Sequence, residues 1–415
     1  MSSARCELLV FALAALYGTV IGCRCSEEPT GPRDADSADA TPPDARLPDS
    51  GVPDGSADAR VLPDAIQHYF CNEPFFKLPI DGQSERIIGI AMQSEHIVWS
   101  KQQENAPDLF GDISVLDLTT CIERQVTSGS LAGGVSVYAG TVVWDESNVE
   151  FDKWGYELFA IDLNTDIQER LTVTSQIELK PKYNGRYLAY RRMETLDDPT
   201  SLRLLDLQTG DDTELSPGWT NIESFDINER YVIWVAYTQD PLSTGRDVYY
   251  HDLSSGETHH IDATYERYQY WSFLWEDWIT IRGTDNHMTR PSHLSLYNLV
   301  TQEQRSLLEG DYSVGSGPID SGLVVWNTSA YSGSTDLFPA DMELYDIDTG
   351  LTRRLTSHEG LTAPTAIASP YLLIIRRLFL YDRFMNDYYI ANLEALGVID
   401  GTGTLIPGAP VINPP

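Results

Sequence analysis

The sequence contains few cysteines and few basic residues for its length. Its 415 residues include five cysteines, and no two of them have the Cys-x-x-Cys spacing of a zinc or redox site. The 28 basic residues stand against 62 acidic ones, which gives a formal net charge of −34 at pH 7. Because such a surface repels nucleic-acid phosphates, we expect no nucleic-acid partner and favour a cationic or neutral one.

Sequence motifs that carry catalysis are also missing. There is no Gly-x-Ser-x-Gly elbow and no phosphate-binding loop. His259 and His260 fall in one expected strand, so their side chains point to opposite faces and cannot chelate one metal together. His287 and His293 flank a loop that offers no obvious acidic third ligand. We therefore expect no cofactor, no metal and no catalytic residue.

No hydrophobic run is long enough to span a membrane as a helix. The run from Leu8 to Ile21 has 14 residues, whereas a helix that crosses the hydrocarbon core needs about 20. A run of this length after a basic residue, here Arg5, is typical of a signal peptide. We assign residues 1–22 to that signal.

The end of the signal resembles a bacterial lipobox. Val20-Ile21-Gly22-Cys23 places a small residue before a cysteine, and the resemblance implies that Cys23 is lipidated with palmitate-like chains and becomes the new N-terminus. Two or more acyl chains hold a protein stably on a membrane. Arg24 stands where that family has an inner-membrane retention Asp, which favours the outer membrane. Ordinary signal cleavage and an uncleaved anchor are the alternatives.

Residues 23–65 have the composition of a disordered linker. From residue 26 to 65 the chain repeats Pro-Asp and Asp-Ala units, has no aromatic residue, and carries ten acids against three arginines. Such a segment buries too little apolar surface to offset the entropy of ordering it. We expect an extended stalk between the lipid and a domain at residues 66–415.

One pattern recurs through that domain. A short apolar strand ends in an aromatic residue, as in Ile97-Val98-Trp99 and Val142-Val143-Trp144, and a second strand then ends in an Asp or Asn anchor before a turn. The anchors are separated by 44 to 48 residues, a period typical of propellers or solenoids. The anchors are Asp117, Asp162, Asp206, Asp252, Asn298, Asp346 and Asn392.

The strand chemistry favours the propeller. Each repeat is rich in Val, Ile, Tyr, Trp and Leu, is punctuated by turn residues, and has room for four strands. We predict an all-β, seven-bladed β-propeller of four-stranded blades, monomeric, behind the stalk. The repeats resemble the TolB-like (PD40/WD40-like) propeller family in lines such as VVW…YELFAIDLNTDIQERLT (142–172) and VVW…MELYDIDTGLTRRLT (324–356).

The last repeat has only a weak fourth strand of its own. Residues 75–79 could supply that strand from the N-terminal side. Cys71 would then begin the outer strand of the last blade, and Cys121 would lie on the same rim of the first blade. This arrangement predicts a Cys71–Cys121 disulfide in an oxidising compartment.

Long connections between the second and third strands of each repeat would emerge on one face, where recognition usually sits. They offer acidic and aromatic candidates for a binding face, namely Trp154, Asp152, Asp240, Tyr331 and Tyr381. We expect a membrane-anchored envelope lipoprotein whose propeller binds an unknown protein or glycan, or acts as a scaffold. The alternatives are a polysaccharide-acting, lyase-like enzyme and a component of an envelope assembly complex.

Overall fold

The computed structural model describes the part of the chain that carries the repeats. The described residues are 67–68, 73–78, 80, 87–102, 111–148, 155–216, 221–237, 246–261, 268–286, 289–308, 312–315, 317–330, 341–356, 361–380, 383–409 and 411–412. The chain divides after Ala59, and all of these residues belong to the second unit, Arg60–Pro415. Within them the regular structure is entirely β-strand, and no helix is long and apolar enough to cross a bilayer. The predicted signal (residues 1–22) and the predicted linker (residues 23–65) lie outside this part.

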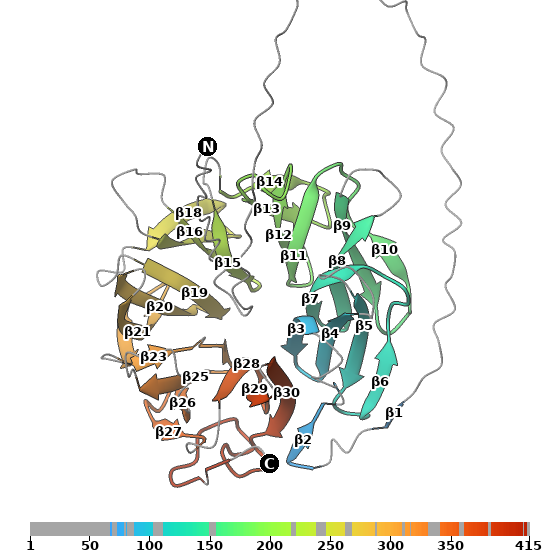
Figure 1. Ribbon diagram of the computed structural model, residues 1–415. Helices are drawn as coiled ribbons and strands as arrows, with labels where there is room; N and C mark the ends of the chain where they lie inside the picture. Colours follow the sequence, from blue (N-terminus) through green and yellow to red (C-terminus); the bar gives the residue numbers. More distant parts are fainter. Residues whose placement is uncertain are drawn as a thin grey trace, which may run out of the picture. The chain divides into compact units, whose positions relative to one another are not determined.

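The strands form successive antiparallel meanders, most of them with four strands in chain order (Figure 1). The N-terminal meanders consist of β3 (Ile87–Gln93), β4 (His96–Gln102), β5 (Gly111–Asp117) and β6 (Ile122–Gln125); β7 (Ala132–Tyr138), β8 (Thr141–Asn148), β9 (Gly155–Asp162) and β10 (Gln168–Arg170); β11 (Ile177–Tyr183), β12 (Tyr187–Met193), β13 (Ser201–Asp206) and β14 (Asp212–Glu214).

The same arrangement continues through the C-terminal half. There the meanders consist of β15 (Ile222–Ile227), β16 (Tyr231–Tyr237), β17 (Arg246–Asp252) and β18 (Glu257–Ile261); β19 (Tyr268–Trp275), β20 (Trp278–Asn286), β21 (Thr289–Asn298) and β22 (Gln304–Leu308); β23 (Tyr312–Val314) with β24 (Ile319–Asp320), β25 (Leu323–Ala330), β26 (Asp341–Asp346) and β27 (Thr352–Arg354); and β28 (Leu361–Ala368), β29 (Tyr371–Leu380) and β30 (Arg383–Asn392).

Two short strands that precede β3 in the chain each pair with the outermost strand of a meander. One pairs in the last meander and the other in the first. β2 (Phe75–Lys77) pairs antiparallel with β30, with Phe75 opposite Ala391, and so supplies the outer strand that the last repeat lacks. This is the segment that the sequence predicted for that place. β1 (Gln67–His68) pairs with β6, with His68 opposite Ile122. Residues after β30 instead form turns, with one isolated bridge between Ile399 and Leu405.

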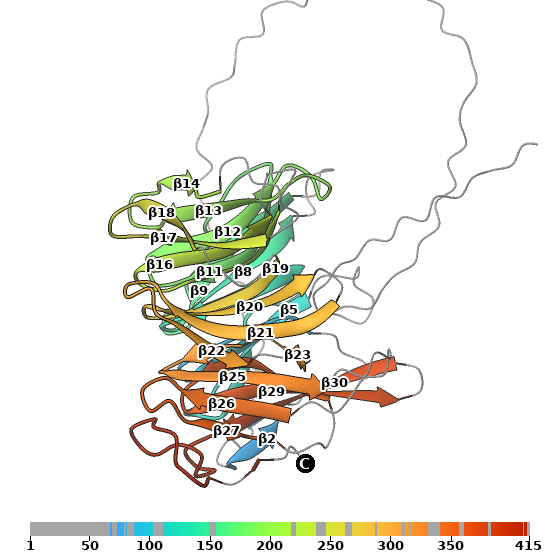
Figure 2. The same cartoon turned by 90° about the vertical axis from the view of Figure 1, so that its left-hand side faces the viewer.

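The first strand of each meander lies innermost, and the inner strands contact one another in sequence. β3 contacts β7, β7 contacts β11, β11 contacts β15, β15 contacts β19, β19 contacts β24, β24 contacts β28, and β28 contacts β3. Figure 1 shows these strands around the middle of the described part, with β6, β10, β14, β18 and β27 at the edge. Figure 2 shows the meanders from the side, stacked face to face.

The apolar core lies between neighbouring meanders rather than inside any one of them. Trp144 on β8 packs with Val98 and Ile113 of the preceding meander, and Trp234 on β16 packs with Leu202 of the meander before it. Leu373 and Ile390 of the last meander share a cluster with Ile97 and Trp99 of the first one. Each aromatic that ends a repeat strand is therefore buried against a neighbour, and the stabilisation of one meander depends on the next.

The anchor residues form the turn between the third and fourth strands of each repeat. Asp117 Oδ1 accepts hydrogen bonds from the backbone N–H groups of Thr119 (2.8 Å) and Thr120 (3.2 Å). Asp162, Asp252, Asn298 and Asp346 make the same two bonds in their own turns. A short side chain with an oxygen at this distance closes such a turn on its own backbone, which explains the Asp and Asn period.

Candidate functional site

Most inner strands contain a β-bulge, and a polar side chain of the second strand lies against several of these bulges. Gly89 pairs with Ser100 at one bulge, and Leu179 pairs with Arg191 at another. Ser100, Asp145, Arg191 and Asn327 each follow directly after a fully buried aromatic residue. This repeat position therefore places polar atoms beside the inner strands.

In the first repeat this polar atom has a purely structural role. The Ser100 hydroxyl accepts a hydrogen bond from Gly89 N (2.9 Å) and donates one to Gly133 O of the next meander (2.5 Å). A Cβ on Gly89 would come within 2.9 Å of Gly133 O, so the two meanders approach closely only because residue 89 is a glycine. Ser100 joins the two inner strands to each other.

In the second repeat the same position holds a buried carboxylate, Asp145, which is only 2% exposed. Its Oδ2 accepts hydrogen bonds from Gly134 N of its own inner strand (2.8 Å) and from Lys180 N of the next one (3.0 Å). Burial raises the pKa of Asp145 to about 7, although both of these backbone hydrogen bonds act to lower it. The carboxylate thus bonds to backbone amides of two meanders.

Lys180 itself lies in the β11 bulge with a φ of 56°, in the left-handed region that few residues with a side chain adopt. Its side chain is exposed. The positive charge of Arg191 on the neighbouring strand lowers the pKa of Lys180 to about 8, with loss of surrounding water as the second cause. Lys180 and Arg191 are therefore two like charges held close together.

Arg191 is held in place without a carboxylate partner among the described residues. Its Nη2 donates a hydrogen bond to the backbone carbonyl of Glu223, and its guanidinium lies 5.7 Å from the centre of the Phe225 ring. Its Nε is buried and has no hydrogen-bond partner there. The backbone and an aromatic ring fix the position of the guanidinium, and its positive charge is not neutralised by direct contact with an acid.

Glu223 forms its ion pair with a different arginine. Arg246 Nε lies 2.7 Å from Glu223 Oε2, and the Arg246 guanidinium stacks 4.5 Å from the centre of the Tyr237 ring. Arg246 is 4% exposed, so this pair belongs to the interior. Burial raises the pKa of Glu223, although the positive charges of four basic side chains act to lower it. Those four are Arg246, Arg191, Lys180 and Arg282.

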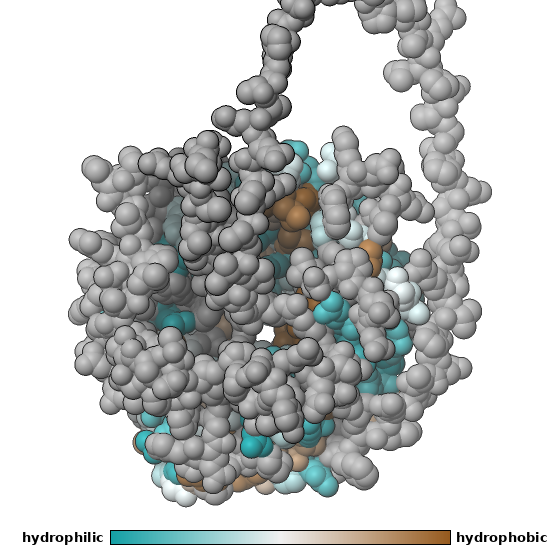
Figure 3. Space-filling view, in the orientation of Figure 1, coloured by the Kyte–Doolittle hydropathy of each residue, from teal (hydrophilic) through white to brown (hydrophobic). Residues whose placement is uncertain are grey.

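We call Asp145, Lys180, Arg191, Glu223, Arg246 and Arg282 the inner charged cluster. Its four basic and two acidic side chains give a formal excess of two positive charges, in a chain whose net charge is −34. The cluster lies toward the end of the second strands from which the long connections leave. In Figure 3, hydrophobic and hydrophilic side chains of described residues are visible beside a gap in the middle of the view.

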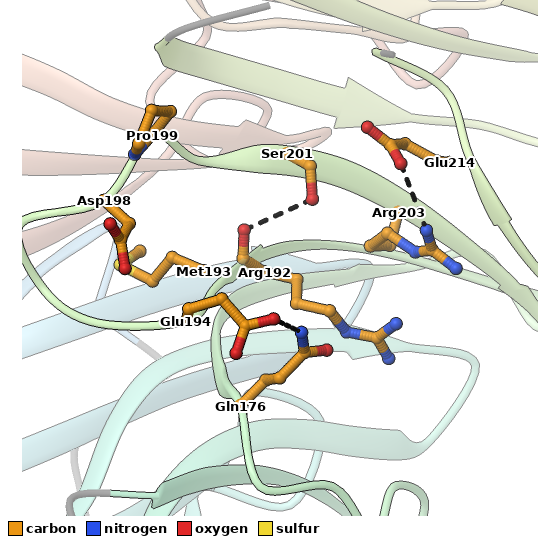
Figure 4. A pocket seen from close by; sticks show the side chains of 9 residues that line it. All are labelled: Gln176, Arg192, Met193, Glu194, Asp198, Pro199, Ser201, Arg203 and Glu214. Atoms are coloured by element: carbon orange, nitrogen blue, oxygen red, sulfur yellow. Dashed lines mark hydrogen bonds and ion pairs between the residues drawn. The ribbon is translucent and has the colours of Figure 1, made fainter. Parts of the chain in front are cut away.

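A second polar region lies on the opposite face of β12. An open pocket of about 420 Å³ is lined by Gln176, Arg192, Met193, Glu194, Asp198, Pro199, Ser201, Arg203 and Glu214 (Figure 4). Its basic residues are paired: Arg192 Nη2 lies 2.7 Å from Glu178, Arg192 Nη1 lies 2.7 Å from Asp212, and Arg203 lies 3.1 Å from Asp212. One wall is the connection from Glu194 to Thr200, one of the long connections that the sequence predicted for binding.

The other predicted binding residues lie outside the described part of the chain. These are Trp154, Asp152, Asp240, Tyr331 and Tyr381, together with Cys23 and Cys71. Cys121 is described, at the turn between β5 and β6 where the sequence placed it, and it is half-buried and has no disulfide partner among the described residues. The β1–β6 pairing brings residue 68 beside residue 122. The Cys71–Cys121 disulfide stays a prediction, and non-reducing peptide mapping would decide it.

The described histidines among those that the sequence offered, His259, His260 and His293, do not gather. His259 stacks on Tyr250 at 4.8 Å and His260 lies against Tyr249 at 4.9 Å, on opposite faces of β18, as predicted for two neighbours in a strand. His293 is half-buried on β21, and His287 lies outside the description. Among the residues that the structure describes, no three side chains are placed to hold a metal ion.

Sequence reasoning missed the inner charged cluster. The signal was present, because Asp145 and Arg191 follow the buried aromatic in positions where the corresponding repeats have Ser100 or Val235. Within the sequence of a single strand, Asp145 and Arg191 each look like an isolated exposed charge. They become a cluster only when the strands of different meanders are brought side by side.

No protein-family model matches the sequence, and no curated protein matches it. The resemblance to the TolB-like family therefore stays a prediction.

Solved structures, in contrast, match over most of the chain. The propeller domain of the Trilobed protease from Pyrococcus furiosus is 12% identical, with a TM-score of 0.55, covering 74% of this chain and 93% of that one. An oligogalacturonate lyase in complex with manganese is 13% identical, with a TM-score of 0.50, covering 72% and 88%. The acylaminoacyl peptidase of Pyrococcus horikoshii is 12% identical, with a TM-score of 0.54, covering 75% of this chain and 52% of that one. At these identities the similarity shows the fold alone: this chain contains an all-β propeller.

Proposed function

We propose that this chain is a ligand-binding propeller without catalytic activity, held at a bacterial envelope membrane by lipid on Cys23. The observation that carries the binding role is the inner charged cluster, where Arg191 has no acidic partner in direct contact. A partly buried charge without an acidic partner is unfavourable for the fold, so its presence supports a role in binding.

We propose further that the propeller has seven blades and that its ring is closed between the last and the first of them. The strand pairings support this, because β2 from the N-terminal side becomes the outer strand of the meander that contains β30. The contact between β28 and β3, and the cluster shared by Leu373 and Trp99, support closure as well. A ring joined in this way resists opening because β2, which precedes the first meander, and β30, which belongs to the last one, lie in the same sheet.

The lipid anchor is tested by the intact mass of the protein extracted from membranes. A mature chain that begins at Cys23 and carries acyl mass is the expected result, and Cys23→Ala should abolish both the added mass and the membrane association. A soluble chain that begins at another residue would contradict the anchor. It would leave the binding role untouched, because that role rests on residues of the propeller.

A second candidate function is an enzyme that acts on an acidic polysaccharide. The oligogalacturonate lyase among the similar structures suggests it. The overall negative charge argued against a polyanionic substrate, but the excess positive charge of the inner cluster weakens that argument locally. Incubation with oligogalacturonate, with manganese present, separates the two functions. Formation of an unsaturated, ultraviolet-absorbing product would establish the enzyme, whereas an unchanged substrate is expected for a binding module.

Membership of an envelope assembly complex is compatible with the first proposal. It would add a protein partner for the propeller without changing the role of the inner cluster.

A further inference from the structure

We propose that the inner charged cluster binds a small dicarboxylate, with Lys180 and Arg191 as the two side chains that neutralise it. This inference deepens the proposed binding role and rests on it.

Two members of the cluster already pair with each other. Arg246 pairs with Glu223 at 2.7 Å, and the Arg246 side chain is fixed further by its stacking on Tyr237. Because this pair is buried and close, its charges largely cancel. Arg246 therefore serves as support for the site.

Asp145 does not neutralise Lys180 by contact between their side chains. The hydrogen bonds of Asp145 Oδ2 go to the backbone N–H groups of Gly134 and Lys180. The carboxylate is fixed by these two bonds at the junction of β7 and β11, and the bulge that it stabilises directs Lys180 out of the strand. Asp145 is a positioning residue for Lys180.

Lys180 and Arg191 are the two cationic side chains of the cluster for which the described residues show no direct contact to an acid. Arg191 bonds only to the Glu223 carbonyl, and no ion pair joins Lys180 to a described acid. Leu179 and Arg191 are register partners on β11 and β12, so Lys180 lies one residue from the position opposite Arg191. Like charges at such proximity repel, and an anion between them would remove that cost.

The chemistry of the pair favours carboxylates. A guanidinium offers a planar fork of N–H groups that matches the two oxygens of a carboxylate, and an ammonium contributes a second, more compact positive charge. Lys180 is exposed, so a ligand can reach it from solvent. Two unpaired positive charges are balanced by a small molecule with two carboxylates, and a monocarboxylate would balance only one.

The test is titration of the full-length chain with succinate, acetate and sulfate by calorimetry, at constant ionic strength. Succinate is expected to bind, and acetate to bind about tenfold or more weakly because it loses one charge-assisted contact. Equal binding of sulfate and succinate would overturn the dicarboxylate assignment. No difference between succinate and acetate would do the same.

Variants assign the contacts. Arg191→Gln and Lys180→Gln should each weaken succinate binding about tenfold or more. Lys182→Gln is the matched control, because Lys182 lies on the same strand and is partly exposed but has Asp226 at 3.9 Å, so binding should change far less than in Lys180→Gln. Lys180→Gln removes an exposed charge and tests the site even if Arg191→Gln destabilises the fold, which thermal melting would report.

Failure of this inference and failure of the proposed function give different results. If succinate does not bind but another ligand shifts the melting temperature, the propeller remains a binding module and only the dicarboxylate site is wrong. If the chain instead converts oligogalacturonate, the proposed function itself is wrong.

Discussion

The two faces of strand β12 carry two charged networks that differ in one respect. On one face, Arg192 meets Glu178 and Asp212 at 2.7 Å each, and Arg203 adds a further bond to Asp212. On the other face, the adjacent Arg191 bonds to a backbone carbonyl and faces Lys180, which has the same charge. Arg191 and Arg192 are adjacent in the sequence, yet Arg192 lies in a neutralised environment and Arg191 in a positively charged one.

The difference shows how charge is used in this propeller. Burial would raise the pKa of Asp212, but the hydrogen bond from Arg203 and the charge of Arg192 together lower it, as expected for an acid in a satisfied ion-pair network. On the opposite face the pKa of Glu223 is raised, and that of Lys180 is lowered. The first network joins the four strands of one meander, whereas the second keeps an excess of positive charge.

The largest expected effect comes from breaking the neutralised network. Glu178 is fully buried, and Glu178→Ala would leave Arg192 with one acidic partner fewer in a water-excluded place. Loss of one partner of a buried ion pair costs about 3 kcal/mol. We expect a fall of that size in the free energy of unfolding, measured by urea denaturation.

An exposed ion pair is the matched control for that change. Glu303 lies 2.7 Å from Arg305 and its side chain is 48% exposed, so Glu303→Ala should cost less than about 1 kcal/mol. Equal losses for Glu178→Ala and Glu303→Ala would contradict the structural role assigned to the buried network.

A smaller effect is expected from crowding the junction that positions Lys180. A Cβ on Gly134 would lie 2.7 Å from Asp145 Oδ2 and 3.1 Å from the Lys180 backbone, so Gly134→Ala should cost about 2 kcal/mol and weaken succinate binding as well. Gly401→Ala is the control, because its nearest neighbour would be 3.5 Å away. Unchanged melting and binding in Gly134→Ala would show that the junction is more open than the contacts indicate.

The fold could be predicted from the sequence because its determinants are local and repeated. Asp117 and its equivalents close their turns with hydrogen bonds to residues two and three positions further along the chain. Their regular spacing can therefore be recognised in the sequence alone. Trp99 and Trp144 mark the strand that is buried on both sides. The completion of the last repeat by Phe75–Lys77 was predicted too, because that repeat visibly lacked a strand.

The inner charged cluster could not be predicted in the same way. Arg191 and Glu223 are 32 residues apart, and the contact between them depends on how one meander packs on the next. The overall charge of −34 favours a cationic or neutral ligand, and a sum over the whole chain does not show that the inner charged cluster has a local excess of the opposite sign. The long-connection residues Trp154 and Tyr331 lie outside the described part and stay predictions.

A further expected effect is a change in the pH dependence of stability, produced by Asp145→Asn. This variant keeps an oxygen that can accept the hydrogen bonds from Gly134 and Lys180 but removes the titrating carboxyl. The pKa of Asp145 rises from 3.8 to about 7 on folding, so between those values the folded chain holds a proton that the unfolded chain has lost. The free energy of unfolding of the wild-type chain should therefore fall as the pH increases from about 4 to 7.

Because Asp145→Asn lacks this contribution, its stability relative to the wild type should be lowest near pH 4 and should improve up to pH 7. Urea denaturation of both chains at a series of pH values measures that difference directly. A difference that does not vary with pH would mean that Asp145 is already ionised in the folded chain at pH 4. In that case the negative charge of Asp145 would offset part of the positive charge of Lys180 and Arg191 over the whole pH range. The excess of positive charge on this face of β12 at low pH would then be smaller than it is with a protonated Asp145.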